Sequence, residues 1–227
     1  MIGDSARTAP VSAPGTAPVL ELRLPGAWRS IPLTDVAAAR AAVQRLVEES
    51  VGPADDRATL RRELRASLEG GLADAVAGEG RSFHVALEIA PGIPTPATIA
   101  VLEPALRLSP ALGVEAAETG GVLEQVLRAT RPDALASLER IEHAHSAVVR
   151  LHRRTQQHVD IDGEPLTLPD GSSAPQTVDR LDAEYWMTVP GSKRVLLLHA
   201  STPLGALETE MLRLFDGIVR AARWVVG

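Results

Sequence analysis

The chain has 227 residues, a net charge of -6 and no cysteine, and its acidic residues outnumber its basic residues by 29 to 23. The missing cysteines exclude disulfides, thiolate zinc sites and cysteine nucleophiles. An acidic chain with only 3% aromatic residues also argues against a nucleic-acid partner, which requires a basic surface and rings that stack on bases. No apolar run approaches the roughly 18–20 residues of a membrane span, so we expect no membrane span and a cytoplasmic location.

The N-terminal segment 1–18 is rich in Pro, Ala, Ser and Gly, a composition that predicts a flexible leader. It lacks the basic region followed by an apolar region that marks a secretory signal. Residues 19–227 contain no internal repeat and no stretch with the composition of a linker. We therefore expect a single domain over residues 19–227.

Alternation and helical spacing predict the elements of the N-terminal part. Residues 19–24 alternate apolar and polar side chains, as a half-buried strand does. A helix is predicted to begin at a cap formed by Thr34 or Asp35 and to end before Gly52. A second helix is predicted over residues 55–77, where apolar residues recur every four positions. We expect these two helices to form a hairpin that lies across a sheet.

The middle of the chain mixes both periods. Strands are predicted over residues 81–90 and 97–108, and a short helix over residues 121–129. Residues 134–144 and 146–161 are expected to form a pair of strands.

The C-terminal part gives the clearest pattern. A loop rich in Pro, Gly and Ser is predicted at residues 162–175, followed by an antiparallel hairpin of residues 178–189 and 193–200. In the last helix Asp216 is expected on the solvent side, opposite an apolar face formed by Leu207, Met211, Leu214, Phe215, Ile218 and Ala222. These elements predict an α+β fold in which helices pack on an antiparallel sheet.

Three histidines are considered as a metal site, and the leading expectation is that they are surface histidines and that no metal is bound. The alternative is a metal site: His143 and His145 are two residues apart, so on a strand they point to the same face, and His152 could supply a third ligand. We expect no bound cofactor.

A basic strip is the candidate for partner binding. Arg150, His152 and Arg154 share one face of a predicted strand, where guanidinium groups could hold a carboxylate or phosphate. The alternative is an ordinary solvated strand face. Tyr185 and Trp186 are adjacent, so one ring faces the core and the other could anchor a partner, unless a helix covers the second face. Tyr185 joins Arg150, His152 and Arg154 in the predicted partner-binding set.

Motifs for hydrolysis are missing from the sequence, which contains no G-x-S-x-G, H-E-x-x-H or phosphate-binding glycine loop. His199 could pair with Asp216 or Glu208. Buried histidines that only stabilise a fold are the commoner arrangement, so His199 is the candidate for an alternative activity and not for the leading one.

The C-terminal sequence resembles the closing hairpin and helix of Mog1/PsbP-like domains, and of a family of uncharacterised proteins from high-GC bacteria. The resemblance is carried by turn-forming and core residues, namely Tyr185-Trp186, Val189-Pro190-Gly191, Ser201-Thr202-Pro203, Leu214–Ile218 and Arg223-Trp224. It implies an α/β/α sandwich around an antiparallel sheet, used mostly for binding by cofactor-assembly, transport-associated and secretion-chaperone proteins. Many such relatives are lipoproteins or secreted, and this sequence contains neither signal.

The leading hypothesis is therefore a non-enzymatic binding, adaptor or chaperone-like protein with a protein partner, including a secretion- or toxin-related one. Two alternatives remain: a small metal-dependent or His/Asp hydrolase, and a homo-oligomeric structural component.

Overall fold

The computed structural model describes residues 18–33, 35–51, 58–90, 92–108, 116–158 and 177–225. Its helices are α1 (Val36–Val51), α2 (Ala58–Ala77), α3 (Ala116–Thr130) and α4 (Glu208–Ala221), with the short 3-10 helices η2 (Pro132–Ser137) and η3 (Gly205–Leu207). Its strands are β1 (Val19–Glu21), β2 (Ala27–Pro32), β3 (Gly80–Ala90), β4 (Ile93–Pro94), β5 (Thr98–Leu102), β6 (Glu139–Ile141), β7 (Val148–His158), β8 (Thr177–Thr188), β9 (Val195–Thr202) and β10 (Arg223–Val225). Residues 1–17 of the predicted leader, Thr34, the predicted start of the second helix and the predicted loop at 162–175 lie outside the described residues. In the ranges given above, no helix has both the length and the apolar character needed to cross a membrane.

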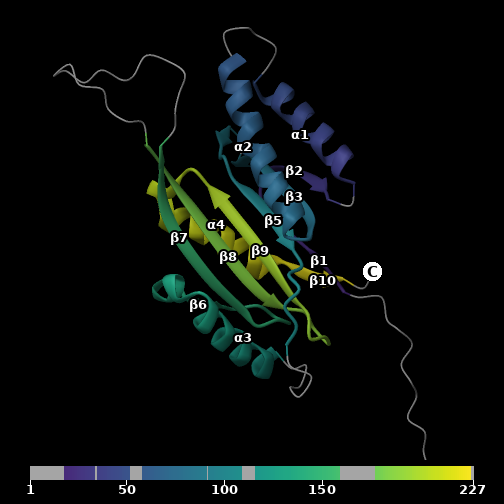
Figure 1. Ribbon diagram of the computed structural model, residues 1–227, viewed down its shortest axis with the longest axis vertical. Helices are drawn as coiled ribbons and strands as arrows, with labels where there is room; N and C mark the ends of the chain where they lie inside the picture. Colours follow the sequence, from purple (N-terminus) through teal and green to yellow (C-terminus); the bar gives the residue numbers. More distant parts are fainter. Residues whose placement is uncertain are drawn as a thin grey trace, which may run out of the picture.

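One large antiparallel sheet organises the chain. Its strands follow the order β2-β3-β5-β9-β8-β7-β6, and β4 pairs with β3 beside this path. The predicted C-terminal hairpin is the β8–β9 pair, in which Tyr185 lies opposite Leu198. The predicted α+β class, with helices on an antiparallel sheet, is confirmed (Figure 1).

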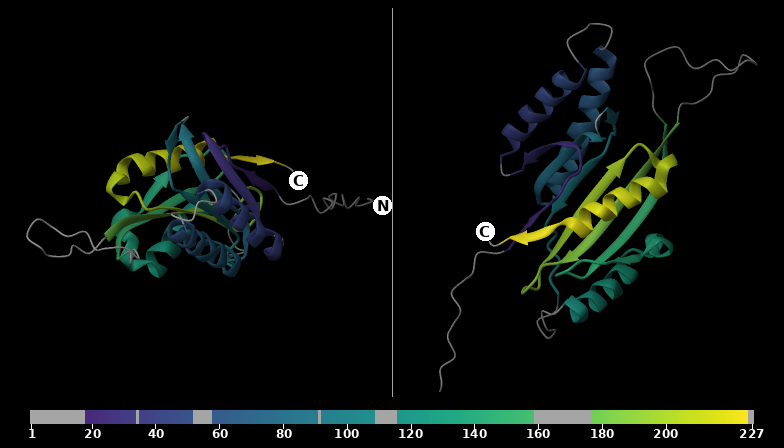
Figure 2. Two further views of the ribbon diagram at one scale, coloured as in Figure 1. Left: turned by 90° about the horizontal axis from the view of Figure 1, so that it is seen from above. Right: turned by 180° about the vertical axis from the view of Figure 1, so that it is seen from behind.

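Helices cover both faces of the sheet, because neighbouring side chains of a strand point to opposite faces. On β8, Tyr185 and Met187 pack in a core cluster with Phe215 of α4. Trp186, between them in sequence, points the other way and packs with Leu127 of α3. Figure 2 shows α4 on one face and α1, α2 and α3 on the other. We call these the α4 face and the α2/α3 face.

The helical hairpin of α1 and α2 lies over β2, β3 and β5, as predicted. Val43 and Val47 of α1 and Leu68 and Leu72 of α2 share a core cluster with Phe83 of β3. All five are buried, and burial of each such side chain is worth about 1.5–3 kcal/mol. The apolar side chains that recur every four residues in α2 are therefore the ones that pack against the sheet.

Helix α4 has most of the predicted apolar face, although Leu207 lies before the helix and is 49% exposed, and one polar residue lies on this face. Met211, Phe215 and Ile218 are buried against the sheet. Asp216, expected on the solvent side, is only 7% exposed and also faces the sheet. The prediction for Asp216 is wrong because its partners lie on β7 and β8, far away in sequence.

A two-stranded ribbon joins the two ends of the described chain. β1 pairs with β10 in the antiparallel register Val19↔Val225, Leu20↔Trp224 and Glu21↔Arg223. Trp224 fixes the ribbon to the body of the protein, because its indole Nε1 donates a hydrogen bond to Ser146 Oγ at 2.8 Å. The predicted strand at 19–24 is thus confirmed over its first three residues only.

Candidate functional site

A pocket of about 1030 Å³ lies between α2 and the sheet. Leu46, Leu64, Leu68 and Phe83 contribute to its largely apolar lining from the helical hairpin and β3. β8 and β9 contribute the opposite wall, which includes Ser201. Small-molecule pockets measure roughly 300–1,000 Å³, so this pocket can hold a ligand of that size or several side chains of a peptide.

The charged groups around the pocket are mainly acidic. Glu49, Asp74 and Glu88 contribute carboxylates, and Arg180 contributes the guanidinium group of the lining. The Nε of Arg180 donates to Oδ1 of Asp182 at 3.0 Å, so its charge is already balanced by a carboxylate outside the lining. Glu49 is likewise paired with Arg29 at 3.0 Å, so Asp74 and Glu88 are the carboxylates of the lining that favour a ligand with a cationic group next to its apolar part.

Two adjacent glycines keep the wall formed by α2 open. Gly70 and Gly71 both line the pocket. A Cβ atom added at Gly70 would meet nothing within 4 Å, whereas one added at Gly71 would lie 3.3 Å from Cζ of Phe83. Gly71 thus lets the helix approach the ring of Phe83, and Gly70 leaves space that a ligand can occupy.

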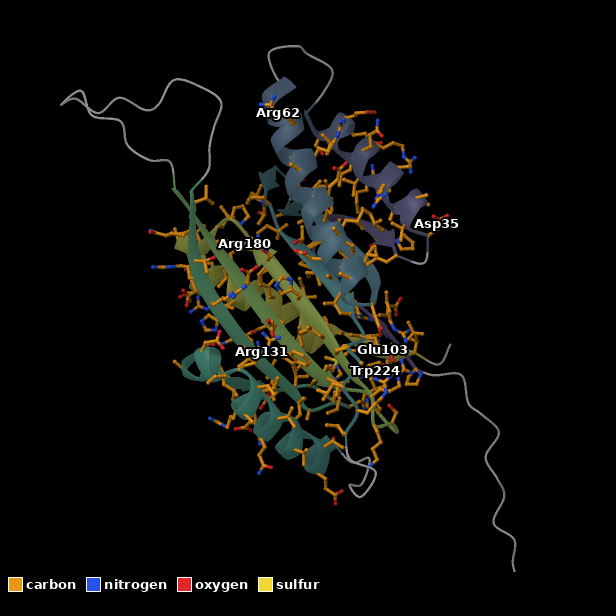
Figure 3. The ribbon with its side chains drawn as sticks, viewed as in Figure 1. Asp35, Arg62, Glu103, Arg131, Arg180 and Trp224 are labelled. Atoms are coloured by element: carbon orange, nitrogen blue, oxygen red, sulfur yellow. The ribbon has the colours of Figure 1, made fainter. Side chains whose placement is uncertain are left out.

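Beside the pocket, a polar strip crosses the α2/α3 face between α2 and α3. We define the polar strip as Arg153 on β7, Arg180, Asp182 and Glu184 on β8, and His199 on β9. The carboxylate of Asp182 lies at its centre, 3.9 Å from Arg153 Nε and 3.6 Å from His199 Nε2. In Figure 3, Arg180 and Arg131 mark the two ends of this open part of the sheet.

His199 is held in its neutral form. Burial lowers the pKa of His199, although the neighbouring carboxylates of Asp182 and Glu184 act to raise it. The distance of 3.6 Å to Asp182 is too long for a hydrogen bond, so the contact is a weak electrostatic one. A neutral imidazole has a nitrogen lone pair that can take a proton from a bound group, which is the chemical capacity of this strip.

The other end of the polar strip is fixed by Trp186. Its indole Nε1 donates to Glu184 Oε2 at 2.9 Å. The guanidinium of Arg131 lies 3.5 Å from the same carboxylate oxygen and 5.8 Å from the ring centre of Trp186, a distance suited to a cation–π contact. The ring of Trp186 is thus covered by α3 and Arg131. This is the arrangement given above as the alternative to a ring that anchors a partner.

Two residues of the predicted partner-binding set are buried under α4. Arg150 is 6% exposed and Tyr185 is 1% exposed, so the expectation that they lie on a solvated surface is wrong. Arg150 Nη1 donates to Asp216 Oδ2 at 2.7 Å, and the Tyr185 hydroxyl donates to Asp216 Oδ1 at 2.7 Å. Arg150 also forms an ion pair with Glu139. Arg150 is buried because the even-numbered residues of β7 point toward α4.

Asp216 also explains the ionisation of its two partners. Burial alone would lower the pKa of Arg150, but the hydrogen bond and charge of Asp216 raise it above its ordinary value. Burial, and then the carboxylate of Asp216, raise the pKa of Tyr185 well above its usual range. The three groups therefore form a charged, hydrogen-bonded link between the sheet and α4.

The two other residues of that set lie further along β7. The side chain of His152 is largely covered, and its Nε2 donates to Glu208 Oε1 at 3.1 Å at the start of α4. Arg154 lies beyond the end of α4 and is exposed. Of the four predicted residues, Arg154 has the exposure that a partner contact requires, and its binding role stays a prediction.

The predicted metal ligands do not converge. His143 and His145 lie in the segment between β6 and β7 and not on a strand, and His143 Nε2 donates to the Ala222 carbonyl at 3.1 Å. Burial lowers the pKa of His143, which this hydrogen bond partly offsets. His152 is bonded to Glu208. In the described ranges of the chain, no three His, Asp or Glu side chains are placed to hold a metal ion, so the alternative of a metal site formed by these three histidines is wrong.

Sequence reasoning missed Asp182 as the partner of His199. Asp216 and Glu208 were the expected partners, but both belong to α4, on the opposite face from His199. The residues of the polar strip follow the period of two on β8 and β9. The predicted hairpin of residues 178–189 and 193–200 was the available signal, but the sequence did not give its register, which places Ser201 opposite Asp182 and His199 opposite Glu184.

Comparisons with known proteins add one distant likeness. No family model matches the sequence, and no curated protein matches it either. Among solved structures, the crystal structure of LpqN, described as involved in cell envelope biogenesis of Mycobacterium tuberculosis, matches with a TM-score of 0.39 and 13% identity, over 95% of this chain and 87% of that chain. A likeness at that level carries no argument about fold or function.

Proposed function

We propose that this chain is a non-enzymatic binding protein, of the adaptor or chaperone-like kind, which holds an apolar segment of a protein partner in the pocket beneath α2. The observation that carries the proposal is the pocket of about 1030 Å³ with its apolar lining. Apolar surface transferred from water gains roughly 25 cal/mol per Å². The carboxylates of Asp74 and Glu88 favour a segment with Lys or Arg next to its apolar residues.

The histidines that could carry chemistry on the α4 face already hold the fold together. His152 is bonded to Glu208, and His143 to the carbonyl of Ala222. The resemblance of residues 185–224 to Mog1/PsbP-like domains is in keeping with an adaptor role. A secretion- or toxin-related partner, met in the cytoplasm, is the form of this role that we favour.

The polar strip supports a second candidate function, a His/Asp hydrolase. Neutral His199 lies beside Asp182, and Ser201 follows on the same face of β9 and lines the pocket. A histidine of this kind can act as a general base for a bound nucleophile. We rank it second because His199 and Ser201 are not joined by a hydrogen bond among the described residues.

The test uses two matched glycines. Gly70→Leu fills the pocket without a clash at Cβ, and Gly217→Leu makes the same change on the exposed side of α4, where an added Cβ also meets nothing within 4 Å. A partner is first recovered from the host cells with the wild-type protein and identified by mass spectrometry. Its dissociation constant is then measured by calorimetry with all three proteins.

We expect Gly70→Leu to weaken partner binding at least tenfold (about 1.4 kcal/mol) and Gly217→Leu to leave it unchanged. Equal affinity of both variants would remove the pocket from the proposal. Turnover of a substrate in a hydrolase panel that is lost in His199→Gln, and retained in Gly70→Leu, would favour the second candidate function.

A further inference from the structure

The outer edge of β7 is only partly used by the sheet. β8 pairs with β7 along its whole length, from Val148↔Met187 to His158↔Thr177. On the other side, β6 pairs only with Val148, Val149 and Arg150. From Arg153 onward, no other described strand pairs with this side of β7. We call the backbone of residues 153–156 on this side the β7 edge.

One hydrogen bond fixes which backbone groups point outward. The N–H of His152 donates to Ser137 Oγ of η2 at 3.0 Å, so it points away from β8. In an antiparallel strand the N–H and C=O groups of alternate residues point the same way. The N–H and C=O groups of Arg154 and Gln156 therefore also face outward, where a further strand could bond to them.

The side chains at the β7 edge are cationic on both faces of the sheet. Arg153 lies on the α2/α3 face and is 69% exposed, with its nearest carboxylate, Asp182, 3.9 Å away. Arg154 lies on the opposite face and is exposed. Among the described residues, no acidic side chain forms an ion pair with Arg154. The charge of this edge is thus opposite to the net charge of -6 of the whole chain.

We propose that the β7 edge binds an extended acidic segment of a partner protein, which adds to the sheet as a further strand next to β7. Backbone hydrogen bonds to Arg154 and Gln156 supply the pairing, and Arg153 and Arg154 select carboxylates. A second copy of this chain is a poor occupant, because two β7 edges would bring four guanidinium groups together. The site is separate from the pocket beneath α2.

The test uses a short, capped, fluorescein-labelled peptide of glutamate and valine, with a lysine and valine peptide as the charge control. Binding to the full chain is followed by fluorescence anisotropy. We expect the acidic peptide to bind, with an affinity that falls as salt is added, and the lysine peptide not to bind.

Two variants locate the site. Arg154→Glu reverses one edge charge, and we expect about a tenfold loss of affinity. Gln156→Pro removes an outward N–H without removing a hydrogen bond to β8, and we expect a loss of similar size. Arg40→Glu, the same charge change at an exposed site on α1, and Gly70→Leu in the pocket are expected to bind the peptide as the wild type does.

Hydrogen exchange distinguishes strand pairing from binding by charge alone, because only backbone hydrogen bonds to the peptide slow the exchange of the outward-facing amides. With the acidic peptide bound, exchange of the Arg154 and Gln156 amides is expected to slow, while that of the Arg153 and Thr155 amides, which face β8, changes little. Peptide affinity that is unchanged in both edge variants would overturn the proposal. A concentration-dependent dimer abolished by Arg154→Glu would also overturn it, in favour of a second copy as the occupant.

Discussion

At the scale of single residues, Asp216 links α4 to the sheet through buried hydrogen bonds. Its two carboxylate oxygens accept hydrogen bonds from Arg150 and Tyr185 at 2.7 Å each. All three groups are buried, and Arg150 has one further partner, the exposed Glu139. A buried ion pair adds little over a well-packed apolar core, but removing one partner is costly because a charge stays behind.

We therefore expect Asp216→Asn to lower the free energy of unfolding by about 3 kcal/mol, because the buried Arg150 then keeps only the exposed Glu139 as a charged partner. Tyr185→Phe removes only one hydrogen bond and should cost about 1–3 kcal/mol. Urea unfolding followed by circular dichroism measures both values. Glu210→Gln, an exposed change on the same helix, is the control. A smaller loss for Asp216→Asn than for Tyr185→Phe would contradict this account.

His84 makes stability depend on pH. Each of its ring nitrogens bonds a serine hydroxyl, Ser30 at 2.8 Å and Ser82 at 2.9 Å. Burial lowers its pKa from 6.5 to about 4. Between these two values the unfolded chain binds a proton that the folded chain does not, so the contribution to stability is complete above pH 6.5 and is lost as the pH falls toward 4.

The expected loss from His84 over this range is roughly 3 kcal/mol. Burial also lowers the pKa of His143 and His199, so these histidines act in the same direction. The comparison of the wild type with His84→Gln isolates the contribution of His84. Unfolding midpoints in urea at several pH values should fall less steeply toward acid in the variant. Parallel curves for the two proteins would show that His84 does not titrate in this range.

At the scale of elements, regular periods and the pairing of neighbouring strands were predictable, whereas contacts between distant segments were not. The β8–β9 hairpin and the apolar face of α4 follow from residues that are neighbours in sequence. Strand β2 was missed because most of its residues are exposed at the edge of the sheet, which leaves no alternating pattern. The side taken by Asp216 could not be predicted, since Arg150 lies 66 positions earlier.

The two glycines of α2 give a prediction about that helix. Gly70→Ala should raise the free energy of unfolding by about 1 kcal/mol, because alanine favours the helix and an added Cβ meets nothing within 4 Å. Gly71→Ala should gain less or lose, because its Cβ would lie 3.3 Å from Phe83 Cζ. Thermal unfolding measures the difference. An equal increase in the free energy of unfolding at both positions would mean that α2 is not tightly packed against the ring of Phe83.

At the scale of the whole molecule, the candidate site combines segments that sequence reasoning treats separately. The pocket joins the helical hairpin and β3 to β8 and β9, and the polar strip spans three strands. The basic residues on β7 were found from their spacing, but which of them α4 covers depends on the complete sheet. The hypothesis of a binding protein came from the missing catalytic motifs in the sequence, whereas the proposed binding surfaces could be located only from the tertiary structure.

The β1–β10 ribbon determines how the protein responds to force. Val19 and Val225 are paired at the same end of the ribbon, so tension applied through the two ends of the described chain pulls the strands apart sideways. The hydrogen bonds of the ribbon then break one after another, at a low force. The long strands at the centre of the sheet come under tension only after the ribbon has opened, so the ribbon protects the core from weak pulling forces.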